Sequence, residues 1–150
     1  MDYNLYIILP EDDLEQVGIT EIKASWGEEN ISYNPRRFMF ENKVQMIFSR
    51  YKLISELEES IDKNEVTLKI MEGLRELEWD VNKETENLKS NDIIKLLQNI
   101  CQLDKFSIYI FEDDEIIEQQ IQYTNETNII LVVIDALKWK SPKNIRIFSK

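Results

Sequence analysis

Three groups of neighbouring carboxylates are the residues of this chain best suited to chemistry. They are Glu11, Asp12 and Asp13, then Glu28 and Glu29, and then the run Glu112, Asp113, Asp114 and Glu115. Clustered carboxylates attract cationic proteins, and their oxygens also bind Mg²⁺ or Ca²⁺ as hard ligands. The spacing matches no calcium-binding loop, because such a loop places ligands at alternate positions with a glycine in the middle and a glutamate at its end. We therefore expect these residues to bind a partner protein and not a metal.

A nuclease pattern can also be written from the first acidic group. Asp12 or Asp13, followed by Glu21-Ile22-Lys23, is the order typical of metal-dependent nucleases, in which carboxylates hold Mg²⁺ and a lysine steadies the attacking water. Such a short pattern arises easily by chance in a chain rich in Glu, Ile and Lys. The negative charge around it opposes a phosphodiester substrate. A carboxylate-dependent metal hydrolase or nuclease is therefore the third-ranked hypothesis.

Several residue types that catalysis commonly needs are scarce. The chain has no histidine, which removes the commonest general base and the main zinc ligand, and its three glycines are too far apart to form a phosphate-binding loop. Cys101 falls on the apolar side of an expected helix, so we interpret it as a core residue. Trp26, Trp79 and Trp139 are likewise interpreted as packing residues. These features predict a protein that is not an enzyme and uses no cofactor.

The overall charge indicates the kind of partner. With 29 acidic and 18 basic residues the net charge is −11, which repels nucleic acid and anionic membranes and attracts basic proteins. A length of 150 residues predicts a single domain, residues 1–150. The N-terminus lacks the basic and small-residue features of a signal peptide, and the lone cysteine excludes an internal disulfide. We therefore expect a cytoplasmic protein.

The first two thirds of the chain combine strand and helix patterns. Strands are expected at 3–9, 19–26 and 31–33, with a short helical turn from Leu14 to Gly18. Apolar residues three or four apart predict helices at 40–61 and 66–81, and a third from about 90 to 103. Residues 65–72 also alternate, so a strand remains an alternative there.

The last third of the chain predicts strands at 106–111, 117–123, 128–135 and 145–148. The run Ile129–Ile134 is wholly apolar, so we expect 128–135 to be a central strand covered on both faces. The predicted fold is α+β: an antiparallel meander of about four C-terminal strands, joined by the N-terminal strands, with about three helices from the middle of the chain packed against it.

The favoured functional hypothesis is a small acidic binding protein that masks a basic partner. In size and composition the chain resembles bacterial immunity proteins, which neutralise toxins by covering a cationic site, and this resemblance implies an immunity- or antitoxin-type inhibitor. The alternative is a structural or regulatory module that self-associates or docks through a sheet edge formed by the last strand, Ile145–Phe148. The oligomeric state and the identity of the partner are left open by the sequence.

Overall fold

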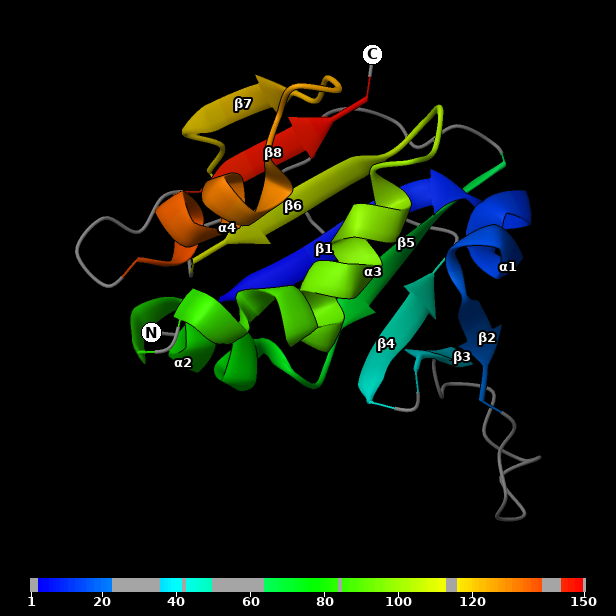
Figure 1. The fold of residues 1–150 in the computed structure, drawn as a ribbon. Helices are drawn as coiled ribbons and strands as arrows, with labels where there is room; N and C mark the ends of the chain where they lie inside the picture. Colours follow the sequence, from blue (N-terminus) through cyan, green and yellow to red (C-terminus); the bar gives the residue numbers. More distant parts are fainter. Residues whose placement is uncertain are drawn as a thin grey trace.

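The computed structural model describes residues 3–22, 36–41, 43–49, 64–83, 85–112, 116–138 and 144–149. Within these ranges the chain forms an eight-stranded mixed sheet and four α-helices, which confirms the predicted α+β class (Figure 1). No helix in the described part of the chain has the length and apolar character needed to span a bilayer.

The sheet has the strand order β2-β3-β4-β5-β1-β6-β8-β7. Neighbouring strands are antiparallel except β7 and β8, which are parallel. The strands are β1 Asn4–Pro10, β2 Ile19–Glu21, β3 Arg36–Phe40, β4 Val44–Ser49, β5 Glu65–Ile70, β6 Ser107–Phe111, β7 Gln119–Gln122 and β8 Ile145–Phe148.

Strand β1 lies at the centre of the molecule. It pairs with β5 on one side and β6 on the other, so that Ile7 lies opposite both Leu68 and Ile108. Its residues alternate between two buried clusters: Leu5 and Ile7 belong to the main core, whereas Tyr6 and Ile8 belong to a smaller cluster with Tyr109 and Phe111. Because side chains alternate along a strand, β1 is buried on both faces of the sheet.

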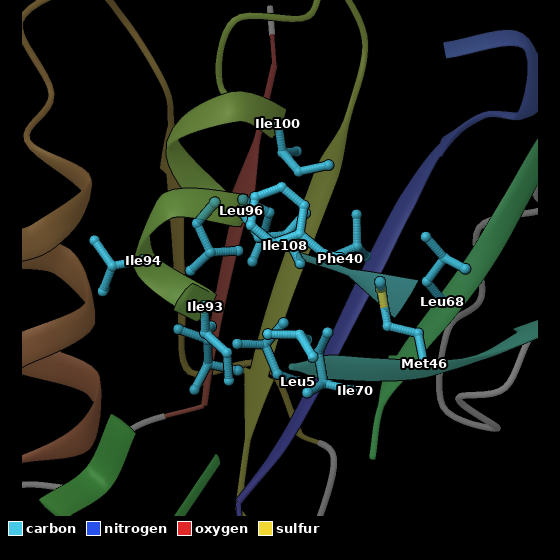
Figure 2. Close-up of a cluster of buried hydrophobic side chains, with 14 of the residues drawn as sticks. Leu5, Phe40, Met46, Leu68, Ile70, Ile93, Ile94, Leu96, Ile100 and Ile108 are labelled. Atoms are coloured by element: carbon cyan, nitrogen blue, oxygen red, sulfur yellow. The ribbon is translucent and has the colours of Figure 1, made fainter. Parts of the chain in front are cut away.

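The helices are α1 Leu14–Val17, α2 Leu74–Lys83, α3 Asp92–Ile100 and α4 Ile129–Leu137, with short 3-10 turns at Glu11–Asp13 and Thr85–Ser90. Helices α2, α3 and α4 lie on one face of the sheet (Figure 1). The start of α3 is capped by Asn91, whose side-chain oxygen accepts hydrogen bonds from the N–H groups of Ile93 and Ile94. In Figure 2, Ile93, Leu96 and Ile100 of α3 point toward the side chains of the sheet, which include Leu5 and Ile108.

The expected central strand at 128–135 is wrong, because these residues begin helix α4. Asn128 caps the helix by accepting a hydrogen bond from the Ile130 N–H. An apolar run of this length does not distinguish a buried strand from a buried helix. The parallel pairing of β7 with β8 decides the outcome, since parallel neighbours need a crossover connection, which is usually a helix.

The helix expected at 40–61 is also wrong where the structure describes it. Val44–Ser49 is strand β4, in which Val44, Met46 and Phe48 are buried and the residues between them are not. Part of this prediction, and all of the expected strand at 31–33, lies outside the described residues. The helix expected at 66–81 divides into strand β5 and helix α2, so the strand alternative holds for its first part. Gly73 separates the two in the left-handed conformation, with φ of 104°.

Some of the remaining predictions are confirmed and others are wrong. Strands β1, β6, β7 and β8, the turn of helix α1 ended by Gly18, and helix α3 are confirmed near their expected positions. The C-terminal meander is not: β8 lies between β6 and β7, and α4 connects the last two strands. Helices also come from both ends of the chain and not only from its middle.

The helical character of 129–137 gives a test with two matched substitutions. Leu137 is 2% exposed and Leu131 is 62% exposed in the same helix. We expect Leu137→Ala to lower the free energy of unfolding by about 2–5 kcal/mol, and Leu131→Ala to change it by less than about 0.5 kcal/mol. Urea denaturation followed by circular dichroism measures both. Equal losses for the two variants would show that Leu131 is buried and the helix is wrongly placed.

Candidate interaction surface

The first acidic group forms a compact turn at the end of β1. Glu11–Asp13 make a 3-10 turn that leads into α1, where Glu15 adds a fourth carboxylate, and the Glu11 N–H donates to the Asn64 carbonyl. We call Glu11, Asp12, Asp13 and Glu15 the acidic turn. Asp12 and Glu15 are exposed, and neither forms an ion pair with another described residue.

Glu112 of the third acidic group lies at the opposite end of the sheet. It follows β6, and the register of β6 against β1 places Phe111 beside Asn4, at the start of β1. The backbone N–H of Glu112 donates to the Asn144 side-chain oxygen over 2.7 Å. The seven residues of β1, at about 3.3 Å each, therefore separate Glu112 from the acidic turn by roughly 20 Å. The other predicted site residues, Glu28, Glu29, Asp113, Asp114 and Glu115, lie outside the described residues.

The charge of Glu112 acts on a buried tyrosine together with that of Glu78 in α2. Tyr3 immediately precedes β1, is 7% exposed and belongs to the main core. Burial, followed by the negative charges of Glu112 and Glu78, raises the pKa of its hydroxyl to about 12. The start of β1, the end of β6 and helix α2 therefore share one electrostatic environment.

Helix α2 carries the one tryptophan that lies within the described residues, Trp79. Leu77 and Val81 are buried toward the core, whereas Trp79 points away from them and is 60% exposed. Met71, just before the helix, is 47% exposed, and the Lys83 ammonium lies 5.9 Å from the centre of the Trp79 ring. We call Met71, Arg75, Glu78, Trp79 and Lys83 the α2 surface.

Two hollows adjoin the α2 surface and have Arg75 and Glu78 in common. One, of about 580 Å³, is lined by these two residues together with Trp79, Asn82 and Lys83. The other, of about 760 Å³, extends from α2 to Tyr3 and Asn4 at the start of β1. The α2 surface exposes tryptophan, methionine and arginine, which are residue types enriched at protein-binding surfaces.

Interpreting Trp79 as a packing residue is therefore wrong, and the sequence contained the signal that corrects it. Leu74, Leu77 and Val81 form the apolar stripe of α2, and a helical period of 3.6 residues places position 79 on the opposite side. Trp26 and Trp139 lie outside the described residues.

Glu21 of the nuclease pattern forms an ion pair with an arginine. The Arg36 guanidinium donates two hydrogen bonds to the Glu21 carboxylate, over 2.9 and 2.7 Å, and these bonds lower the pKa of Glu21. Arg36 is also held over the Phe48 ring, 4.5 Å from its centre. A metal ion at Glu21 would have to displace this guanidinium. No group of three acidic, cysteine or histidine residues is arranged to hold a metal within the described ranges, and Lys23 lies outside them.

Cys101 is a core residue, as expected. It is 8% exposed at the end of α3, and burial raises the pKa of its thiol to about 12. The thiol therefore stays protonated near neutral pH, which is the unreactive form.

Comparison of the chain with protein families, curated proteins and solved structures finds no significant match.

The raised pKa of Tyr3 predicts how the stability of the protein depends on pH. Because the folded chain raises the pKa of Tyr3 from 10.0 to about 12, the folded state retains a proton that the unfolded state loses, and stability should fall as the pH rises between these values. Glu112→Gln should lower the midpoint of Tyr3 but leave it above 10.0, since burial is the larger cause. Glu15→Gln, at the other end of β1, should leave it unchanged.

The measurement is an NMR pH titration of tyrosine ring carbons, with Tyr3 assigned by comparison with Tyr3→Phe. A Tyr3 midpoint at the ordinary value of about 10 would contradict the burial of its hydroxyl.

Proposed function

We propose that the chain is a small acidic binding protein that masks a basic protein partner, as an immunity- or antitoxin-type inhibitor masks a toxin, and that the α2 surface makes the central contact. The observation that carries the proposal is Trp79, 60% exposed on a helix that also bears Glu76 and Glu78. Tryptophan is enriched among the few residues that dominate binding energy at protein interfaces.

The net charge of −11 supports the basic character of the partner. A negatively charged surface accelerates the approach of a cationic protein at low salt, and this effect acts over distances longer than a direct contact. The acidic turn is suited to this role although it lies about 20 Å from Glu112, because long-range attraction depends on the summed charge. The two ends of β1 thus have different roles: the α2 surface contacts the partner and the acidic turn attracts it.

This division predicts a separation of rate constants once the partner is purified by affinity capture from the native host. Trp79→Ala should increase the dissociation rate at least tenfold, because truncation of a central interface residue removes about 2 kcal/mol or more. Glu15→Gln should leave the dissociation rate unchanged and slow association slightly at low salt. Surface plasmon resonance at two salt concentrations measures both rates.

Leu131→Ala is the matched control, because Leu131 is also a large exposed apolar residue, 62% exposed, and lies in the first half of α4. If Leu131→Ala and Trp79→Ala increase dissociation equally, the contact is not centred on α2. Association that is independent of salt would remove the electrostatic part of the proposal.

A second candidate function, self-association or docking through a sheet edge, is favoured by strand β7 and not by the last strand. β8 is an inner strand, whereas β7 pairs only with β8 among the described strands. The Gln119 and Tyr123 N–H groups donate to Asn144 and Phe148, so by alternation the backbone of Gln120 and Gln122 faces outward. The edge Gln119–Gln122 carries neither charge nor proline, the residue types that usually protect an edge strand.

This candidate predicts a dimer in sedimentation equilibrium of the full chain. Gln122→Lys should weaken it, because a lysine on each paired edge introduces repulsion between like charges. Gln16→Lys, an exposed glutamine in α1, is the matched control and should leave the equilibrium unchanged. A monomer at all concentrations would rule out self-association through β7.

A further inference from the structure

The larger hollow beside the α2 surface is lined by both polar and apolar residues. It lies between the start of β1, the end of β5 and the first turns of α2. Its polar wall includes Tyr3, Asn4, Glu72, Arg75 and Glu78, and Met71 adds an apolar side chain that is 47% exposed. A volume of about 760 Å³ is ample for one long side chain.

Tyr3, which lines this hollow, has a hydroxyl without a hydrogen-bond partner among the described residues. The hydroxyl is a buried oxygen on a residue that is 7% exposed, and no group of the described residues donates to it or accepts from it. A buried hydroxyl without a partner is destabilising, and most buried polar groups in proteins are paired. A ligand that supplied a donor to this oxygen would therefore gain a hydrogen bond that the free protein does not make.

The charges around the hydroxyl favour a cationic donor. Glu78 and Glu112 both raise the pKa of Tyr3, so two carboxylates act at the position of its oxygen. The ammonium of Lys69, whose residue also lines the hollow, lies 5.8 Å from the centre of the Tyr6 ring on the other side of the sheet. Ammonium and guanidinium groups have only donors, which suits a hydroxyl oxygen and two carboxylates.

We infer that this hollow binds the cationic head group of a lysine or arginine side chain of the partner, which donates to Tyr3 and Glu78 while its aliphatic stem lies along Met71. The inference rests on the proposed function, because it names the chemical group that the basic partner inserts at the α2 surface. The hollow shares Arg75 and Glu78 with the one beside Trp79, so one partner segment can occupy both.

Substitution of Arg75 distinguishes cation binding from a general structural effect. Arg75 is exposed, lines both hollows and forms no ion pair with another described residue. Its positive charge repels an entering cation, so Arg75→Gln should strengthen cation binding. Tyr3→Phe and Glu78→Gln should weaken it. A purely structural effect of these exposed or conservative substitutions would not act in opposite directions.

The experiment is an NMR titration of the full chain with N-acetyl-arginine amide and N-acetyl-lysine amide, and with N-acetyl-citrulline amide as the neutral isostere of the arginine probe. We expect saturable shifts of the Tyr3 ring signals with at least one cationic probe and none with citrulline. Tyr3→Phe and Glu78→Gln should each weaken binding about fivefold, as expected for one lost hydrogen bond. In Tyr3→Phe the ring signals of the substituted residue report the binding.

Shifts of equal size with citrulline, unsaturable shifts, or weaker binding after Arg75→Gln would overturn the inference. The two proposals fail separately. If Trp79→Ala weakens partner binding and the cationic probes do not bind, the inference is wrong and the proposed function stands. If the probes bind as expected, but neither salt nor Trp79→Ala changes the binding of the partner, the proposed function is wrong and the cation site stands.

Discussion

The central position of β1 is the constraint on which the rest of the structure depends. Because it pairs with β5 and β6 and is buried on both faces, its two ends cannot approach each other. The acidic turn follows one end. Tyr3 precedes the other end, where the charge of Glu112 contributes to the raised pKa of the Tyr3 hydroxyl. Acidic groups that look equivalent in the sequence are thereby assigned to different parts of the surface. A single acidic face that unites Glu112 with the acidic turn is incompatible with this arrangement.

Because the two ends of β1 are far apart, long-range attraction of a partner and direct contact with it can involve different parts of the surface. Surface carboxylates in water contribute little as individual ion pairs, and their effect on approach depends on their sum. Contact energy comes from apolar and aromatic area removed from water, and the α2 surface offers this area in Met71 and Trp79. The same end of the sheet contains the Tyr3 hydroxyl, which has no hydrogen-bond partner in the described part of the chain. The exposed apolar and aromatic area therefore favours α2 as the contact surface. The net charge alone does not distinguish between the two ends of β1.

Local signals predicted much of the fold. Gly18, with its left-handed φ, ends α1, and Asn91 caps α3, whose start the sequence places at about residue 90; both helix ends were correctly interpreted. The run Ile129–Ile134 was not, because its apolar pattern fits helix and strand equally, and the parallel β7–β8 pairing that decides between them is a long-range property. For the site, the acidic groups were visible in the sequence but their distance was not. Trp79 was predictable from the helical period once α2 was recognised as starting after Gly73.

Hydrogen–deuterium exchange of the full chain, with and without its purified partner, determines whether a basic partner contacts α2 or the acidic turn. We expect slower exchange on binding at Leu74–Lys83 and little change at Glu11–Val17. Slower exchange confined to Glu11–Val17, with Leu74–Lys83 unchanged, would contradict the proposed contact at α2.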